Sequence, residues 1–337
     1  MKTQKRKYTK AKPQITALIA TRGEDPGNVR RTVENLKKCG VVVFTEEDTG
    51  ADGAWGAGRI QHRLAQKAKT KYLLKTDAHC EFAGKFFDAA IRQLDEWQSG
   101  IVYGQCEMVH GDMDGTGTVY CGADLTKDFR CVWRKAEPAD KIVETSGIMG
   151  ANYVFGRDAY FEFGAPLEYL KAWGMEEELL TAAFRRHGAK LYLLPITTRH
   201  LYNATRAGRN PTGQEAEWVG AQKWAAAWWC GADKKEFNNI CWFYGNMEPN
   251  EKYKNHGAEL RAHLENCPVK FDALFGNNPR MAISPMLADE TEHIDGRLGD
   301  PSISCRHEWK THKYENGNTR RFCFWCGEIK WDYAEGA

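Results

Sequence analysis

The chain has 337 residues, of which 42% are hydrophobic and 27% charged, and its formal net charge is +2. This length and composition indicate a soluble globular protein with a sizeable core, and the balanced charge excludes a chain that binds polyanions through its total charge. No apolar run approaches the roughly 18 residues of a membrane-spanning helix, so we expect no membrane association.

Basic residues are concentrated at the N-terminus, where residues 1–12 contain six Lys or Arg and no acid. We predict that residues 1–13 form a basic leader, either a disordered solubilising segment, which we favour, or an arm that contacts phosphates. It lacks the apolar segment of a secretory signal. The 11 cysteines are odd in number and mostly dispersed, which is typical of free thiols, and we expect a cytoplasmic location.

Strand and helix patterns alternate through residues 14–205 and predict a doubly wound α/β domain. The predicted strands are 14–20, 41–45, 72–79, 101–106, 148–155 and 190–195. The predicted helices are 26–39, 59–69, 86–97 and 179–187, with Asp25 as the cap of the first. The strand at 41–45 is apolar throughout, which predicts a parallel strand buried on both faces. Residues 107–145 are polar and receive no assignment.

The connection 46–58 is rich in Gly and Asp and follows the second predicted strand. It lacks the G-x-G-x-x-G pattern that a dinucleotide-binding fold carries after its first strand. We interpret it either as a flexible loop on the ligand side of the sheet or as a plain surface loop.

The stretch 72–81 is the one around which we expect the domain to be organised. On a strand, Asp77 and His79 project to the same side, so a carboxylate and an imidazole meet at the C-terminal edge of the sheet. This pair suits a divalent first-row cation, and Mn²⁺ better than Mg²⁺. The alternative is that Asp77 caps the next helix and His79 is satisfied locally.

Three consecutive carboxylates, Glu176, Glu177 and Glu178, open the predicted helix that ends before Gly188. Acidic residues favour a helix N-terminus because of the helix dipole, which explains the run without any function. The functional alternative is that one of them projects into a ligand cleft and takes a proton from an acceptor hydroxyl.

The C-terminal part reads as three regions. Residues 206–275 form an aromatic-rich helical extension, whose Trp residues pack in a core or stack on bases, and 276–303 form a linker. Residues 304–333 are predicted to be a small zinc ribbon around a hairpin that turns at Asn316-Gly317. Its ligands are Cys305, His307, Cys323 and Cys326, with His312 as a substitute for His307.

We expect the zinc to be structural, because four protein ligands leave no open position. The alternative is that the thiols are coincidental. Basic and aromatic residues in 306–325 resemble those of nucleic-acid-binding ribbons found often in phage proteins. The ribbon could equally stabilise the fold or hold another protein.

Four motifs in order within residues 15–202 resemble those of GT-A fold glycosyltransferases, in particular the polypeptide N-acetylgalactosaminyltransferases and related family-two enzymes. They are Arg31-Thr-Val-Glu-Asn-Leu36, Asp77-Ala-His-Cys-Glu81, Trp173-Gly-Met-Glu176 and Arg199-His-Leu-Tyr202. The resemblance implies a Rossmann-like mixed sheet with helices on both faces over residues 14–205. It departs at Met175, where the N-acetylgalactosaminyl enzymes have Gly, and at Glu177, where they have Asn.

The resemblance also implies a UDP-sugar donor and a Mn²⁺ (or Mg²⁺) ion held by Asp77, His79 and His200. The nucleotide-sugar site would contain Thr21, Arg22, Asp48, Asp52, Asp77 and Trp173. Glu177 would be the base of an inverting enzyme, whereas in a retaining enzyme Glu176 would position the acceptor. The sequence leaves the stereochemistry, the sugar and the oligomeric state open.

The acceptor that we favour is a 5-hydroxymethylpyrimidine base in phage DNA, so the partner would be double-stranded DNA in the host cytoplasm. The basic leader, the ribbon and the aromatic extension suggest it. One alternative is a glycosyltransferase acting on protein or on a cell-surface glycan or lipid. Another is a nucleic-acid- or protein-binding factor with an inactive core.

Overall fold

The computed structural model describes residues 13–49, 56–97, 100–111, 113–125, 131–135, 138–170 and 174–202, and three strands within 309–332. The chain divides into two compact units, residues 1–285 and 286–337, and each is considered by itself. The aromatic extension expected at 206–275 and the linker expected at 276–303 lie outside the described residues. No helix in the described ranges is long and apolar enough to cross a bilayer.

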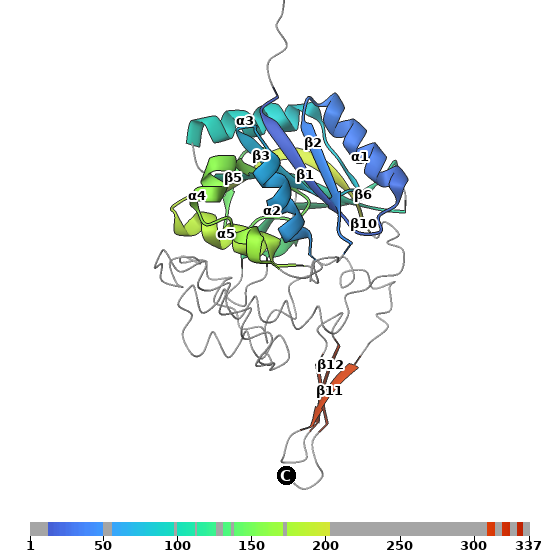
Figure 1. The fold of residues 1–337 in the computed structure, drawn as a ribbon. Helices are drawn as coiled ribbons and strands as arrows, with labels where there is room; N and C mark the ends of the chain where they lie inside the picture. Colours follow the sequence, from blue (N-terminus) through green and yellow to red (C-terminus); the bar gives the residue numbers. More distant parts are fainter. Residues whose placement is uncertain are drawn as a thin grey trace, which may run out of the picture. The chain divides into compact units, whose positions relative to one another are not determined.

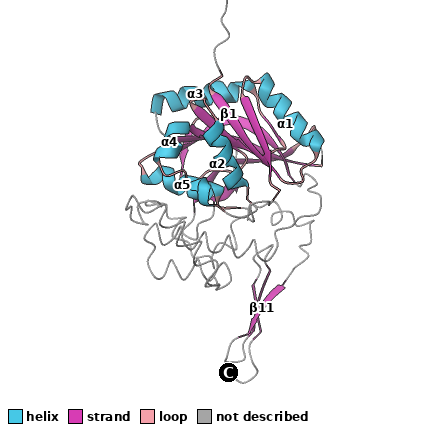
Figure 2. Ribbon diagram, viewed as in Figure 1, coloured by secondary structure: helices cyan, strands magenta, loops and turns pink. Residues whose placement is uncertain are grey.

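A mixed sheet of ten strands forms the centre of the first unit (Figures 1 and 2). Its strands are β1 (Ile15–Thr21), β2 (Val42–Glu47), β3 (Tyr72–Thr76), β4 (Cys80–Glu81), β5 (Gly100–His110), β6 (Gly117–Leu125), β7 (Cys131–Lys135), β8 (Val143–Thr145), β9 (Asn152–Gly156) and β10 (Lys190–Tyr202). Hydrogen-bonded neighbours follow the order β2-β1-β3-β9-β5-β10-β4, with β6, β7 and β8 off this path. β1 is parallel to β2 and β3, and β10 is parallel to β5, whereas β9 runs antiparallel between β3 and β5.

Helices cover both faces of this sheet (Figure 1). They are α1 (Pro26–Lys38), α2 (Ala57–Lys67), α3 (Gly84–Trp97), α4 (Arg157–Glu162), the 3₁₀ turn η1 (Pro166–Tyr169) and α5 (Glu176–Arg186). Alternate residues of β3 serve the two faces, as the pleat requires. Leu73 belongs to the core formed with α2, α4 and α5, whereas Tyr72 and Leu74 belong to the core formed with α1 and α3. The expected mixed α/β sheet with helices on both faces is therefore confirmed.

The second predicted strand corrects one expectation. β2 is parallel to β1, but its residues are only half-buried or exposed. The reason is its place at the end of the sheet order, where one side of the strand has no neighbour among the described strands. An apolar run such as Val42-Val-Phe44 therefore does not distinguish an edge strand from a central one.

The chain after α3 contains more strand than its polar composition indicates. Residues 107–145 hold the end of β5 and all of β6, β7 and β8, and β9 begins at Asn152 and not at Ile148. The strand expected to end at Pro195 continues to Tyr202, with a register shift between Leu194 and Thr197. Because Pro has no N–H to donate, the ladder is interrupted there and then resumes. This continuation places His200 on β10.

The second unit contains an antiparallel three-stranded sheet, ordered β11 (Trp309–Lys313), β12 (Thr319–Cys323) and β13 (Ile329–Asp332). Lys313 pairs with Thr319, which agrees with a hairpin whose turn includes Asn316-Gly317, although the turn lies outside the described residues. Cys305, His307 and Cys326 also lie outside them, and of Cys323 only the backbone is described. The zinc site stays a prediction.

Candidate functional site

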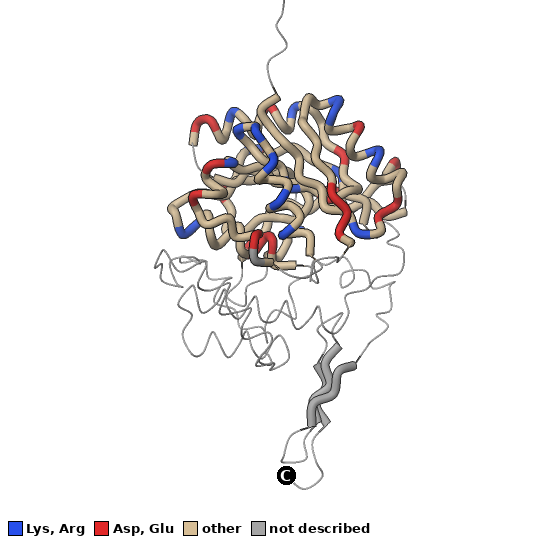
Figure 3. Tube along the Cα trace, viewed as in Figure 1, with Lys and Arg blue, Asp and Glu red and all other residues tan. Residues whose placement is uncertain are grey.

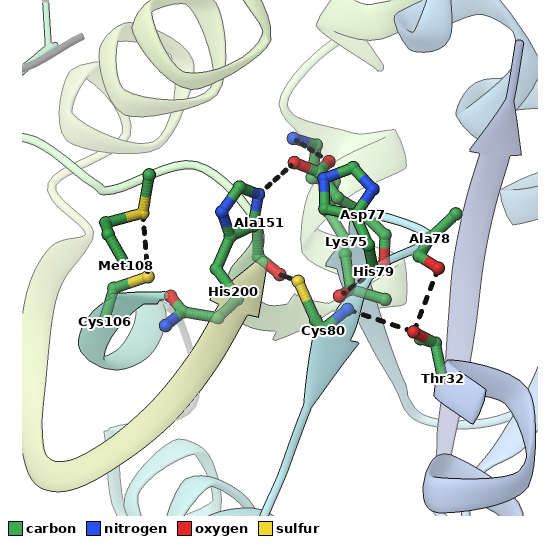
Figure 4. Close-up of polar contacts among 12 residues, drawn as sticks. Thr32, Lys75, Asp77, Ala78, His79, Cys80, Cys106, Met108, Ala151 and His200 are labelled. Carbon is green, nitrogen blue, oxygen red and sulfur yellow. Dashed lines mark hydrogen bonds and ion pairs between the residues drawn. The ribbon is translucent and has the colours of Figure 1, made fainter. Parts of the chain in front are cut away.

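Three side chains from distant parts of the chain meet at one edge of the large sheet. Asp77 and His79 follow β3, and His200 lies near the end of β10, where it pairs with Cys80 of β4. One ligand atom from each of the three lies within 4.8 Å of the others. Asp77 Oδ2 is 3.2 Å from His200 Nε2, and the two imidazole centroids are 4.7 Å apart (Figure 4).

The segment Asp77-Ala78-His79 is a turn between β3 and β4, not an extension of β3. Both side chains reach the same point, as the sequence predicts, but the strand geometry assumed for them is wrong. The buried hydroxyl of Thr32 on α1 holds this turn by donating to the Ala78 carbonyl and accepting from the Cys80 N–H, each at 3.0 Å (Figure 4). Thr32, the second residue of the Arg31-Thr-Val segment, therefore fixes the turn that carries Asp77 and His79.

A fourth group, Glu24, contacts the three from the loop between β1 and α1. Its Oε2 is 3.2 Å from His79 Nδ1, and both side chains are less than a tenth exposed. A carboxylate on one ring nitrogen of a histidine fixes the ring and directs the other nitrogen toward a ligand. Glu24 is therefore placed to orient His79.

The charges around Asp77 favour its ionised form. Burial alone raises the pKa of Asp77, but the Lys75 ammonium and the His200 hydrogen bond outweigh it and hold this pKa well below its usual 3.8. Burial lowers the pKa of His200, although the contact with Asp77 opposes that shift. The group therefore offers a carboxylate and a neutral imidazole at neutral pH, which are the protonation states that bind metals.

This donor set fits a divalent cation. Ligands about 2.1 Å from a metal lie roughly 3–4 Å from one another. Asp77 Oδ2 and His200 Nε2 are 3.2 Å apart, and all three ligand atoms lie within 4.8 Å of one another. A mixed set of carboxylate and imidazole ligands suits Mn²⁺, Fe²⁺ or Zn²⁺ better than it suits Mg²⁺, which prefers sites made of oxygen ligands alone. Within the described residues, no hydrogen-bond partner is found for the buried His200 Nδ1.

The acidic run begins α5 (Figure 3), and α5 packs on the same face of the sheet as Leu73. The backbone turns sharply before it, because Gly174 and Met175 both adopt left-handed conformations, with φ of 99° and 78°. For Met175 that conformation costs roughly 1–2 kcal/mol, and its buried side chain packs in the core. A Gly at this position, as in the resembling enzymes, would not carry this strain.

The three carboxylates reach three different environments. Glu177 Oε1 accepts from Lys75 Nζ at 2.9 Å and from the Tyr153 hydroxyl at 3.4 Å. Glu178 Oε1 accepts from the Cys131 N–H at 3.1 Å. Glu176 is buried, and burial together with the charge of Glu177 raises its pKa from the usual 4.5 to about 8. At neutral pH Glu176 is therefore a protonated acid that can donate a hydrogen bond.

The residues expected to line a nucleotide site lie at the ends of β1 and β2. Thr21 is buried, its hydroxyl is 3.4 Å from Glu47 Oε2, and Glu47 Oε1 accepts from the Gly23 N–H at 3.3 Å. Asp48 is also buried and accepts from the Gly56 N–H at 2.7 Å, which occupies one of its carboxylate oxygens. Arg22 is half-buried beside Thr21. Asp52 and Trp173 lie outside the described residues.

Two charged residues of this site were not anticipated. Lys75 is buried in β3 between Asp77 and Glu177, and a lone charge directly after the apolar run Tyr72-Leu-Leu is a signal that the sequence does offer. Glu24 has no such signal, because an acid in a polar loop is ordinary and its partner lies 55 residues away.

No sequence-family profile matches this chain, and no curated protein matches it. Among solved structures, the crystal structure of GalNAc-T7 with UDP, GalNAc and Mn²⁺ is similar, with a TM-score of 0.60 at 14% identity. The match covers 91% of this chain and 62% of that one, so this chain spans less than two thirds of its length. At this identity the likeness shows the fold alone, and it supports the expected GT-A fold.

The structure of A197 from STIV matches 56% of this chain and 85% of its own at 13% identity. Its TM-score of 0.36 is too low to carry an argument.

Proposed function

We propose that this protein is a metal-dependent glycosyltransferase that moves a sugar from a UDP-sugar to a hydroxyl acceptor. The observation that carries the proposal is the meeting of Asp77, His79 and His200 at the edge of a GT-A-like sheet. The GalNAc-T7 crystal structure, similar in fold, contains UDP, GalNAc and Mn²⁺, and this supports Mn²⁺ and a UDP-sugar as the first ligands to test.

In this proposal Asp77, His79 and His200 hold the Mn²⁺ or Mg²⁺ ion, and Glu24 orients His79. The ion supplies Lewis acidity that neutralises the charge of the departing UDP. Thr21, Arg22 and Asp48 line the uridine side, together with Asp52 and Trp173, which remain sequence predictions.

Glu177 takes the proton of the acceptor hydroxyl if the enzyme inverts, whereas Glu176 positions the acceptor if it retains. The raised pKa of Glu176 supports the second role, since a protonated carboxyl donates a hydrogen bond to a sugar or acceptor oxygen. Its buried Oε1 has no hydrogen-bond partner among the described residues.

For the acceptor we retain the 5-hydroxymethylpyrimidine base in DNA. The segments that suggest it, the basic leader, the aromatic extension and the zinc ribbon, lie mostly outside the described residues. A protein, glycan or lipid acceptor is the alternative, and an inactive binding factor is disfavoured because the three candidate metal ligands lie together.

The test is a screen of radiolabelled UDP-sugars with Mn²⁺ against hydroxymethylated DNA, unmodified DNA, peptides and lipid acceptors, scored for transfer and for UDP release. We expect Mn²⁺-dependent release of UDP with at least one donor, and label on hydroxymethylated DNA but not on unmodified DNA. Label on peptide or lipid alone would replace the acceptor and keep the glycosyltransferase. The proposal would be contradicted if none of the UDP-sugars in the screen released UDP.

A further inference from the structure

Lys75 carries a buried positive charge between two acidic groups of the site. Its Nζ is 2.9 Å from Glu177 Oε1 and 3.4 Å from Asp77 Oδ1, and its side chain is 7% exposed. Figure 4 shows Lys75 next to Asp77 and near the two imidazoles. The two carboxylates come from different elements, the turn after β3 and the start of α5.

The fold itself does not require a charge at this position. Lys75 lies in the middle of the sheet, paired with Leu18 of β1 and Tyr153 of β9, and the preceding residues of β3 are apolar. Burying an ammonium costs several kcal/mol unless carboxylates compensate it. The compensating groups here are Asp77 and Glu177, so the energetics of Lys75 are tied to the candidate site.

We propose that Lys75 is a positioning residue that couples the metal centre to the acidic start of α5. One ammonium is shared by two carboxylates. A cation that binds Asp77 therefore shifts the ammonium toward Glu177. This inference rests on the proposed function, because it takes Asp77 as a metal ligand.

The coupling has a definite sign. An ammonium beside Asp77 repels a divalent cation and competes with it for the carboxylate, and this repulsion is strong in a buried site. Glu177 lies closer to the ammonium than Asp77 does and draws it away from the ligand. Glu177 therefore favours metal binding by holding Lys75, whereas Lys75 released from Glu177 opposes it.

The experiment measures Mn²⁺ affinity of the full chain from the electron paramagnetic resonance signal of free Mn²⁺, with thermal unfolding of the metal-free protein as the folding check. Lys75→Met should bind Mn²⁺ at least about 5-fold more tightly than wild type, which is the lower end of ordinary coupling free energies. Glu177→Gln should bind about 5-fold more weakly. Lys75→Arg keeps the charge and should stay near wild type.

Glu178→Gln is the matched control, because it removes a charge from the same helix start but has a different partner, the Cys131 N–H. Its effect should be smaller than that of Glu177→Gln. In the double variant Lys75→Met/Glu177→Gln, most of the Glu177 effect should vanish, since no ammonium remains to be released.

Two results would overturn the inference while leaving the metal centre in place. One is an equal loss of Mn²⁺ affinity in Lys75→Met and Glu177→Gln, and the other is a Mn²⁺ affinity of Glu177→Gln no lower than that of Glu178→Gln. If Lys75→Met does not fold, Glu177→Gln, Lys75→Arg and the control still decide. No Mn²⁺ binding by the wild type would instead remove the metal centre itself, and with it the proposed function.

Discussion

In the metal-ligand group, residues far apart in sequence share one environment, whereas at the acidic start of α5 adjacent residues occupy different environments. Asp77 and His200, 123 residues apart, meet at 3.2 Å in one shared environment. Glu176, Glu177 and Glu178 are neighbours in sequence, yet one is buried, one pairs with Lys75 and one accepts a backbone N–H. The fold therefore determines which side chains share an environment, and a run of identical residues does not indicate a single role.

The two regions also differ in how their buried carboxylates are compensated. In the ligand group each acid faces a nitrogen, Asp77 facing His200 and Glu24 facing His79. At α5 Glu177 pairs with the Lys75 ammonium, and burial keeps Glu176 neutral. We expect the ligand group to respond to metal and Glu176 to respond to pH, and four substitutions examine the two regions.

The largest effect is expected at the carboxylate of the ligand group. Asp77→Ala should abolish Mn²⁺-dependent UDP-sugar turnover and weaken Mn²⁺ binding by more than about 100-fold, since loss of an outer partner alone costs 10–100-fold. Turnover and Mn²⁺ titration measure it. Asp158→Ala, which removes a carboxylate that is 96% exposed on α4, is the control and should change neither. Retained turnover in Asp77→Ala would remove the assignment of Asp77.

Next comes the turn that carries two of the ligands. Thr32→Val keeps the shape of the side chain but leaves the Ala78 carbonyl and the Cys80 N–H unpaired in the interior. The free energy of unfolding should fall by about 2–6 kcal/mol, because each of the two unsatisfied buried groups costs about 1–3 kcal/mol. Urea unfolding measures this change. Thr32→Ser retains the hydroxyl and should lose less, whereas no loss in Thr32→Val would show that the two hydrogen bonds do not hold the turn.

Thr32 also shows what the sequence can and cannot reveal. The family-like motifs predict that Asp77, His79 and His200 come together, and they do lie together, but spacing alone had put Asp77 and His79 on a strand. The side chains converge because they lie on a turn, and Thr32 of α1 holds this turn through a hydrogen bond to Ala78, 46 residues away in the sequence. Short-range periodicity carries no information on such contacts.

The same limit applies to the fold. Strand and helix positions in the first half follow from apolar periodicity, because each of those elements buries a continuous apolar face. The edge position of β2 and the strands within 107–145 do not follow, since they depend on which strands pair. Glu24 escapes prediction for the same reason, as its partner His79 lies 55 residues away, and the sequence shows the charge of Lys75 but not its pairing with Glu177, 102 residues away.

Glu24 offers a smaller test of the ligand group. Glu24→Gln keeps the size of the side chain but replaces the carboxylate that contacts His79 Nδ1 with a neutral amide. Mn²⁺ affinity should fall about 10–100-fold, the usual effect of losing an outer-sphere carboxylate, with little change in unfolding. Glu81→Gln is the control, because Glu81 lies on β4 next to the same turn but pairs with Arg31 at 3.9 Å. Equal Mn²⁺ affinities for Glu24→Gln and wild type would reject the role of Glu24.

The smallest effect is expected at Glu176 and concerns pH. Because burial and Glu177 raise its pKa from 4.5 to about 8, the folded protein holds this proton more tightly than the unfolded chain does. Its stabilising contribution is therefore fully present below a pH of about 4.5 and is lost as the pH rises through about 8. Glu176→Gln has no such dependence, so the substitution should be nearly neutral at about pH 5 and stabilising at about pH 8.5, by about 1–3 kcal/mol.

Urea unfolding across this pH range measures the difference between the two proteins, and each serves as its own control at the acidic end. A difference that does not grow with pH would mean that Glu176 ionises in the fold as readily as in the unfolded chain. The start of α5 would then hold equivalent carboxylates after all, and the contrast with the ligand group would disappear. A growing difference would instead establish that adjacent acids on one helix turn differ in charge at neutral pH, because Glu177 pairs with the Lys75 ammonium at 2.9 Å whereas burial keeps Glu176 protonated.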